Sequence, residues 1–240
     1  FWLSPGDGDV LWWAMGVAVN SGYNVVVREP DVSPLQLQGP KSPRVARDLF
    51  GDWAVEMKYY RLRETELDGI PLVVSRTGWS GELGYELYLR DSRFGDALWE
   101  RVMQAGEPYG IRPAAPSTVR SIEGGLLSYV SDIDRRDNPY TLGLDRLVNL
   151  DKPGGFIGQE ALRSVAEEGP ARKLVGIEID GDPVAGNEET WPVLAEAVTV
   201  GRVTRCAYSP RLKKNIGFAN VLVELSANGS VLHVNAPQEN

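Results

Sequence analysis

The chain has 240 residues, of which 42% are hydrophobic and 24% are charged, and its formal net charge is -8. This composition is that of a soluble globular protein with one large domain or two modest ones. The acidic balance argues against a nucleic-acid surface, because phosphate binding needs clustered Lys and Arg. Apolar runs such as 10–19 are too short to span a bilayer. We therefore expect neither nucleic acid nor a membrane as a partner.

The residues most often used in catalysis are scarce, since the chain holds one cysteine, Cys206, and one histidine, His233. A single cysteine excludes an internal disulfide and fits a reducing compartment, so we expect a cytoplasmic protein. A catalytic triad, a Cys–His pair or a zinc site would need several such residues. The chemistry must therefore depend on carboxylates, aromatic rings, backbone groups and a bound cofactor, without a metal.

The first part of the chain predicts a mixed α+β region. Capping residues, Pro and Gly positions, and apolar spacing indicate where its elements begin and end. In chain order we expect a helix after Asp7 or Asp9 that ends near Asn20, a strand over 24–29, a strand in "SPLQLQ", a helix capped by Ser42 with Pro43 at its first position, two strands around the Asp68-Gly69 turn, a helix from Phe94 to Ala105, and a helix from Ser117 towards Leu127.

The pattern of residues in the sequence changes near residue 170. A turn and a helix in "DKPGGFIGQEALRSVAEEGP" are followed by short strand-like runs separated by Gly, Asn, Asp and Pro. That pattern is typical of a small antiparallel barrel or sandwich. We expect one region over 1–168 and a second over 171–240. The start at "FWLS", which reads as a strand in progress, and the end at "VNAPQEN" suggest a piece of a longer protein that lacks an N-terminal portion and a final strand.

The stretch "SRTGWSGELGYELYLR", residues 75–90, combines glycines with an acid and large aromatic side chains. Strand alternation puts Glu86 and Tyr88 on one face and Tyr85, Leu87 and Leu89 on the other. The first face is either a solvated edge or the floor of a ligand site. In a ligand site, the Glu86 carboxylate would accept paired hydrogen bonds from a flat N–H-rich heterocycle.

Other polar residues are open to two interpretations each. Trp79 and Tyr88 can line a pocket in which their ring faces attract a cationic reactant, or Tyr88 can simply cover the core. Arg120 can pair with a ligand carboxylate or with a neighbouring acid. Asp7 and Asp9 are expected as helix caps rather than as catalysts.

Five stretches together resemble the glycine-cleavage T-protein family in order and approximate spacing. They are "LQLQGPKS", "SRTGWSGELGYELYL", "VRSIEGGLLSY", "DKPGGFIGQEAL" and "YSPRLKKNIGFANV". The resemblance covers essentially the whole chain, aligned to the middle and C-terminal parts of the family. It implies an α+β folate-binding region followed by a small antiparallel β-barrel, with tetrahydrofolate as the cofactor and a small-molecule substrate. A homodimer stays open.

The resemblance also implies roles for single residues. Glu86 corresponds to the pterin-binding glutamate of the family, and the surrounding positions divide between folate and substrate. By this matching, Ser4 and Arg120 join Glu86 in binding the cofactor, Trp79, Tyr88 and Trp53 lie at the substrate end, and Asp9 falls near the aspartate that handles the folate N5 region. The sequence around Asp9 departs from the pattern "NxxNxxxD", so no residue is assigned as catalytic.

Within the family, "IEGGLLSYVSDIDRRDNPYTLGLD" and "FWLSPGDGDVLWWAMG" resemble dimethylsulfoniopropionate demethylases. Such an enzyme moves a methyl group from a sulfonium to tetrahydrofolate, and leaves methylmercaptopropionate and 5-methyltetrahydrofolate. The alternatives are an aminomethyltransferase of the glycine cleavage system, another folate-dependent O- or N-demethylase, and a folate-binding module without turnover. The missing N-terminal portion would normally supply part of the substrate pocket.

Overall fold

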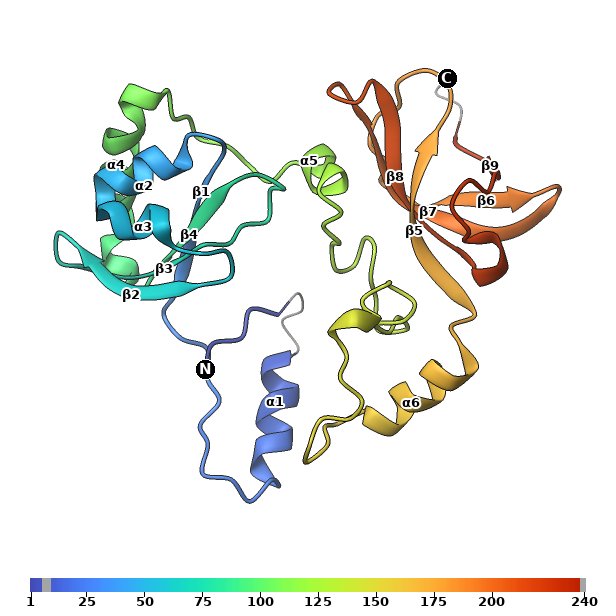
Figure 1. The fold of residues 1–240 in the computed structure, drawn as a ribbon, viewed down its shortest axis with the longest axis horizontal. Helices are drawn as coiled ribbons and strands as arrows, with labels where there is room; N and C mark the ends of the chain where they lie inside the picture. Colours follow the sequence, from blue (N-terminus) through green and yellow to red (C-terminus); the bar gives the residue numbers. More distant parts are fainter. Residues whose placement is uncertain (6–9, 238–240) are drawn as a thin grey trace. The chain divides into compact units, whose positions relative to one another are not determined.

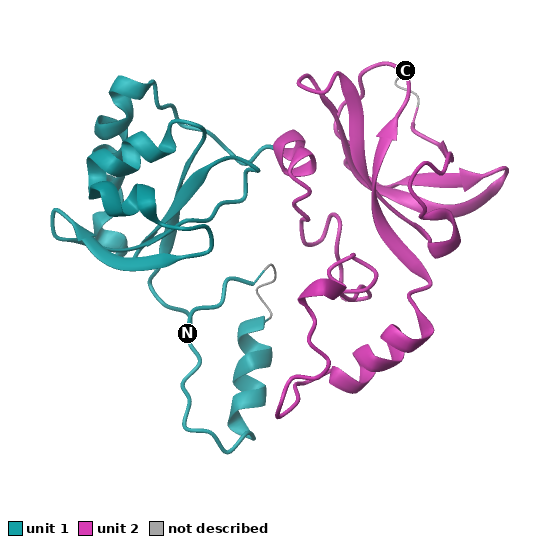
Figure 2. Cartoon of the chain, in the orientation of Figure 1, with its two compact units in different colours: residues 1–117 teal, residues 118–240 magenta. Residues whose placement is uncertain are grey.

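The computed structural model describes residues 1–5 and 10–237. The chain divides into two compact units, Phe1–Ser117 and Thr118–Asn240 (Figure 2). The division differs from the expected boundary near residue 170, which stays a prediction. Within the described ranges, no helix is long and apolar enough to cross a membrane.

The first unit is built on a four-stranded antiparallel sheet with the strand order β1-β4-β3-β2 (Figure 1). Its strands are β1 (Ser33–Gln38), β2 (Leu62–Leu67), β3 (Ile70–Ser75) and β4 (Gly84–Leu89). The predicted turn between β2 and β3 is confirmed, since Asp68 and Gly69 have φ angles of 52° and 82°. Two successive positive φ angles define the type I′ turn that suits the twist of a hairpin.

One face of this sheet is covered by helices and forms the core. The helices are α2 (Ser42–Phe50), α3 (Asp52–Glu56) and α4 (Gly95–Gly106). On β4, the side chains of Tyr85, Leu87 and Leu89 are all buried in this core. The alternation predicted for β4 is therefore confirmed, and it sends Glu86 and Tyr88 to the opposite face.

The N-terminal segment differs from the prediction in two places. Helix α1 (Val10–Val19) forms as expected, although its predicted caps Asp7 and Asp9 lie outside the described residues. The strands expected in "FWLS" and over 24–29 are wrong, because both stretches have no regular structure. The β-branched run of Val25, Val26 and Val27 has no strand beside it to pair its backbone groups, so propensity alone does not make it a strand.

Two predicted helix boundaries also shift. Ser42 is the first residue of α2 rather than its cap, and its hydroxyl donates to the Leu83 carbonyl at 3.0 Å. Helix α5 (Thr118–Glu123) stops well before Leu127, because Gly124 and Gly125 follow it and Gly125 takes a φ angle of 67°. Such a left-handed residue ends a helix.

The second unit contains helix α6 and an antiparallel sheet with the order β5-β8-β7-β6-β9 (Figure 1). The bounds are α6 (Gln159–Glu168), β5 (Arg172–Ile179), β6 (Trp191–Ala195), β7 (Val198–Ser209), β8 (Lys214–Leu222) and β9 (His233–Val234). The predicted change to short antiparallel strands after residue 170 is confirmed, and with it the α+β class.

A buried ion pair ties the irregular segment after α5 to this second sheet. Arg205 on β7 donates to the Asp132 carboxylate at 2.6 Å and to the Ser121 hydroxyl at 2.7 Å. Asp132 also accepts from the Thr204 hydroxyl at 3.0 Å and from the Ser128 backbone at 2.9 Å. With both charges buried, each depends on the other for its stability.

Candidate functional site

The sheet of the first unit places Glu86 at the centre of its helix-free side. Its cross-strand neighbours are Gln36 on β1 and Ser75 on β3. Glu86 and Tyr88 are both half-buried, so they are neither core residues nor fully solvated. This intermediate burial suits a group that meets a ligand from solvent.

The carboxylate of Glu86 is held by three side chains. Its Oε2 atom accepts hydrogen bonds from the Thr77 hydroxyl and from the Tyr88 hydroxyl at 3.2 Å. Its Oε1 atom accepts the Gln36 amide at 3.4 Å, which is longer than a usual N–H···O hydrogen bond. Since a carboxylate oxygen accepts two hydrogen bonds readily, the capacity that is left lies mostly on Oε1.

The protonation of Tyr88 fits this arrangement. Burial, followed by the charge of the Glu86 carboxylate and the hydrogen bond to it, raises the pKa of Tyr88 above the ordinary value of a phenol. The hydroxyl therefore stays protonated at neutral pH and acts as a donor. The carboxylate remains an acceptor for N–H groups of a ligand.

The loop between β3 and β4 is fixed by Gln38. The Gln38 amide donates to the carbonyl oxygens of Thr77 at 3.3 Å and Tyr85 at 3.0 Å. Its oxygen accepts the Ser80 hydroxyl at 2.6 Å. A Cβ atom at Gly84 would lie 2.3 Å from this amide, so glycine makes room for the Gln38 side chain. The clamp sets the position of the loop that carries Thr77 and Trp79.

Tyr88 has an aromatic neighbour, Trp2, on the side of the sheet where Glu86 lies. The ring of Tyr88 lies against Trp2, with a centroid distance of 6.1 Å, and the Arg90 guanidinium lies 5.7 Å from the Trp2 ring. Trp79 is half-buried in the β3–β4 loop. The role of Trp79 and Tyr88 as a wall that faces a cation stays a prediction.

The other predicted site residues lie in separate places. Trp53 on α3 packs against Phe50 at 5.8 Å and beneath the Arg63 guanidinium at 4.5 Å, so its part in a pocket stays a prediction. Ser4 is exposed in a segment without regular structure, which corrects its expected place on a strand. Arg120 is an exposed residue of α5 in the second unit, and Asp9 lies outside the described residues.

Sequence reasoning missed three residues of this site, namely Thr77, Gln36 and Trp2. Thr77 lies inside the glycine-rich stretch 75–90, two residues before Trp79. The alternation in "LQLQ" indicated a polar face for β1, but only the strand register shows that Gln36 lies opposite Glu86. Trp2 lies in "FWLS", which predicted a strand, and nothing in that stretch indicated a contact with Tyr88.

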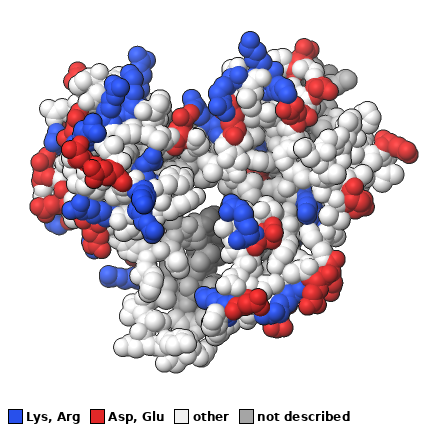
Figure 3. All heavy atoms as spheres, viewed as in Figure 1, with Lys and Arg blue, Asp and Glu red and all other residues white. Residues whose placement is uncertain are grey.

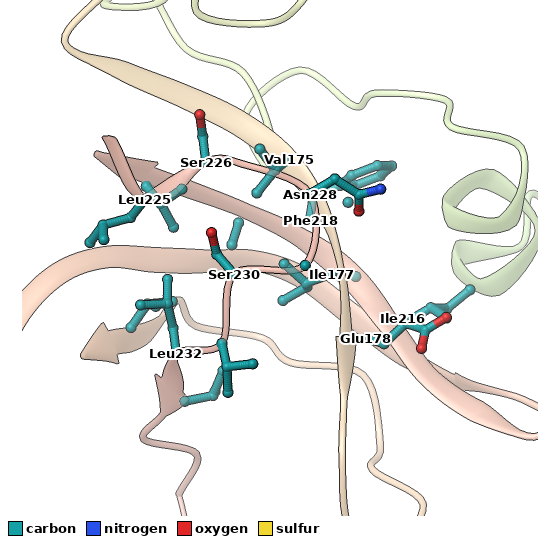
Figure 4. Close-up of a pocket in the computed structure, with 18 of the residues that line it drawn as sticks. Val175, Ile177, Glu178, Ile216, Phe218, Leu225, Ser226, Asn228, Ser230 and Leu232 are labelled. Atoms are coloured by element: carbon teal, nitrogen blue, oxygen red, sulfur yellow. The ribbon is translucent and has the colours of Figure 1, made fainter. Parts of the chain in front are cut away.

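A concave region lies on the second unit. It is a groove of about 820 Å³ between the sheet and the segment that carries Leu225 and Leu232 (Figure 4). Its floor is apolar, and its acids are already paired: Glu178 with Lys214 at 2.6 Å, and Glu123 with Ser209 and Arg211. The groove therefore offers little of the polar chemistry that Glu86 offers.

Charges are mixed over the visible surface (Figure 3). On that face, Lys and Arg alternate with Asp and Glu instead of forming one basic area, and α1 contributes an uncharged surface. In the part of the chain that is described, no group of three or more His, Cys, Asp or Glu side chains is arranged to hold a metal ion. Among the predicted site residues, Glu86 has a carboxylate held by three side-chain donors, and its role in binding stays a prediction.

The protein is a two-part α+β protein. Its first unit has an antiparallel sheet with Glu86 on a central strand and a glycine-containing loop held by Gln38, and its second unit has a further sheet of antiparallel strands. Residues 4–152, which include most of the first unit and the start of the second, match the family described as the GCVT N-terminal domain. Residues 172–240 match the glycine cleavage T-protein C-terminal barrel domain. The chain belongs to the glycine cleavage T-protein family.

Similar proteins carry two different names. The chain is 35% identical to dimethylsulfoniopropionate demethylase DmdA of Ruegeria pomeroyi, over 99% of this chain and 64% of that protein. It is 38% identical to an aminomethyltransferase of Symbiobacterium thermophilum, over 98% of this chain and 64% of that protein. The chain thus spans less than two thirds of the length of these relatives.

A solved structure supports the fold. The glycine cleavage system aminomethyltransferase T of Bartonella henselae superimposes with a TM-score of 0.76, over 95% of this chain and 62% of that one. The sequence identity is 20%, so this likeness concerns the fold alone.

Proposed function

We propose that this protein is a tetrahydrofolate-dependent methyltransferase that demethylates dimethylsulfoniopropionate. The observation that carries the proposal is the Glu86 carboxylate, which is half-buried on the helix-free side of the sheet and held by Thr77 and Tyr88. The 35% identity to the demethylase of Ruegeria pomeroyi supports the choice of donor.

The residues of the site fit a pterin. A pterin presents neighbouring N–H donors on one edge, and a carboxylate pairs with such an edge bidentately. The Oε1 atom of Glu86 has acceptor capacity left, and its present partner, the Gln36 amide, is held only at 3.4 Å. Glu86 would therefore hold the pterin, with Ser4 and Arg120 as further candidates for contacts with the cofactor.

The proposed reaction needs little acid–base catalysis by the protein. The bond between sulfur and one methyl carbon breaks with its electron pair on sulfur, the lone pair of folate N5 forms the new bond to carbon, and the N5 proton leaves to water. A neutral thioether is a good leaving group, so the protein contributes mainly proximity and orientation. Trp79, Tyr88 and Trp53 are the proposed residues around the sulfonium, where ring faces attract a cation.

A second candidate is supported by the identity of 38% to an aminomethyltransferase. In that case the same Glu86 site would hold folate while the carbon unit came from an aminomethyl-lipoyl carrier. Folate-dependent O- or N-demethylation uses the same scaffold, and a folate-binding module would keep the site without turnover. A cytoplasmic location and a homodimer belong to the proposal in the same way.

The test is turnover by the natural full-length protein that contains this chain. Incubation with tetrahydrofolate and dimethylsulfoniopropionate should yield 5-methyltetrahydrofolate and methylmercaptopropionate, measured by chromatography with mass detection. Activity on an aminomethyl-lipoyl carrier without product from the sulfonium would contradict the proposal and favour the second candidate. Folate binding without either activity would indicate the binding module.

A further inference from the structure

The hydroxyl groups behind Glu86 form a directed chain. The hydroxyl oxygens of Ser75 and Thr77 lie 2.7 Å apart, and the Thr77 hydroxyl reaches Oε2 of Glu86. An ionised carboxylate can only accept, and Thr77 has one proton. Thr77 must therefore donate to Glu86, and the Ser75 hydroxyl must donate to Thr77.

The geometry points to Thr77 as the positioning residue of the Glu86 carboxylate, a role that rests on the proposed function of Glu86 in folate binding. Of the three donors to the carboxylate, those of Tyr88 and Gln36 lie at 3.2 Å and 3.4 Å. Thr77 is the donor to Oε2 that comes from the loop held by Gln38. A hydrogen bond to a charged acceptor is of the strong kind, so Thr77 fixes Oε2 and leaves Oε1 for the ligand.

The backbone around Thr77 supports the same role. The Gln38 amide donates to the Thr77 carbonyl at 3.3 Å, and Ser80 in the same loop donates to the Gln38 oxygen at 2.6 Å. Ser75 is buried with 8% of its surface exposed, so its hydroxyl is largely shielded from water. The Gln38 amide thus holds the Thr77 backbone, and the Ser75 hydroxyl holds the Thr77 hydroxyl. These two contacts fix the position of the Thr77 donor although Thr77 lies in a loop.

Positioning predicts an effect that depends on the hydroxyl and not on the shape of residue 77. The variant Thr77→Val keeps the shape and removes the donor, and Thr77→Ser keeps the donor. Thr65 is half-buried on β2 of the same sheet, so Thr65→Val makes the matched change away from Glu86. We expect Thr77→Val to weaken tetrahydrofolate binding roughly tenfold, in line with the loss of one charge-assisted hydrogen bond.

The experiment is calorimetric titration of the full-length protein with tetrahydrofolate, in the wild type and in Thr77→Val, Thr77→Ser, Thr65→Val and Glu86→Gln. The expected result is loss in Thr77→Val, affinity within about threefold of wild type in Thr77→Ser, and no change in Thr65→Val. Thermal unfolding of each variant shows whether it is folded. If Thr77→Val does not fold, Ser75→Ala replaces it and should weaken binding in the same direction.

Two results would overturn the inference in distinguishable ways. If Glu86→Gln loses affinity while Thr77→Val binds like the wild type, Thr77 does not position Glu86 and the proposed function stands. If the wild type does not bind tetrahydrofolate, or if Glu86→Gln binds like the wild type, the role of Glu86 fails and the role of Thr77 fails with it.

Discussion

At the scale of single residues, the site is a carboxylate whose two oxygen atoms have different surroundings. Thr77 and Tyr88 both donate to Oε2 of Glu86, and Oε1 meets only the distant Gln36 amide among the described contacts. The acid and its alternation with the core residues of β4 could be predicted from the sequence. Of its three donors, Tyr88 could be placed on the same face, but Thr77 and Gln36 could not, because they come from a loop and another strand whose register is set by tertiary packing.

Trp79 is proposed to lie at the substrate end of the site. If its ring faces the sulfonium, Trp79→Leu should raise the KM for dimethylsulfoniopropionate by roughly 2- to 30-fold, the equivalent of about 0.5–2 kcal/mol of lost cation–π attraction. Steady-state kinetics with each substrate varied in turn would measure this, and the KM for tetrahydrofolate should stay unchanged.

Trp99→Leu is the matched control for this change, because Trp99 is a partly exposed residue of α4, a helix that packs in the core on the other side of the sheet. Equal effects of the two changes on the sulfonium KM would show that Trp79 has no special role at the substrate end.

At the scale of elements, the space taken by the Gln38 side chain determines which residues fit in the hairpin of β3 and β4. Gly78 and Gly84 both face the Gln38 side chain, at distances that leave no room for a Cβ atom. The sequence indicated a glycine-rich turn, but a turn was the only reason it gave for the glycines. The structure gives a second reason, since the absent side chains make space for an amide that bonds both ends of the loop.

This packing predicts strong coupling between Gly84 and Gln38. Gly84→Ala should displace the Gln38 side chain and reduce the free energy of unfolding by about 1–3 kcal/mol, as hydrogen bonds are lost in a part-buried place. Gln38→Ala should cost a similar amount. Because both changes break the same clamp, the double variant should lose much less than the sum of the two.

Urea unfolding followed by tryptophan fluorescence measures all members of this cycle. Gly95→Ala is a suitable control, because nothing lies within 4 Å of a Cβ atom built at Gly95 and the residue has an ordinary helical conformation at the start of α4. Additive losses for Gly84→Ala and Gln38→Ala would show that the clamp does not couple them.

Other elements show where sequence patterns succeed and fail. The β2–β3 turn, α4 and the strands after residue 170 are predicted from local signals, and each has its partners in the structure. Helix α6 is predicted in the same way and forms, but it has no buried residue. The run over 24–29 has strand-forming residues but no neighbouring strand, and α1 is an apolar helix without a buried residue. Local propensity cannot show whether a partner exists, so it predicts the helix of α1 correctly and a strand over 24–29 wrongly.

At the scale of the whole molecule, each compact unit has its own stabilising centre. The first has an apolar core between the sheet and α2–α4. The second has apolar clusters on its sheet and the buried pair of Arg205 and Asp132. The Nε atom of Arg205 is buried without a hydrogen-bond partner among the described residues, so the desolvation of this N–H group is not offset by a hydrogen bond. The sequence offered no sign that these two distant residues meet.

Breaking this pair should destabilise the second unit strongly. Arg205→Met leaves the Asp132 carboxylate buried without its cation, and the free energy of unfolding should fall by about 3–5 kcal/mol. Replacing both partners, in Arg205→Met with Asp132→Leu, should recover a large part of that loss. Differential scanning calorimetry would measure both variants.

Arg101→Met is the control for the loss of an arginine, because its ion pair with Asp68 is solvent-exposed and such pairs contribute about 1 kcal/mol or less. If Arg205→Met and Arg101→Met had the same small effect, the buried pair would not be the centre of the second unit.

If Glu86 binds the folate, a carboxylate-to-amide change at this position weakens that binding. Tetrahydrofolate is titrated calorimetrically into the full-length protein and into its Glu86→Gln and Glu100→Gln variants, where Glu100 is an exposed acid on α4. We predict that the wild type and Glu100→Gln bind alike and that Glu86→Gln binds more weakly by about 1–3 kcal/mol. Equal affinity of Glu86→Gln and the wild type would contradict it.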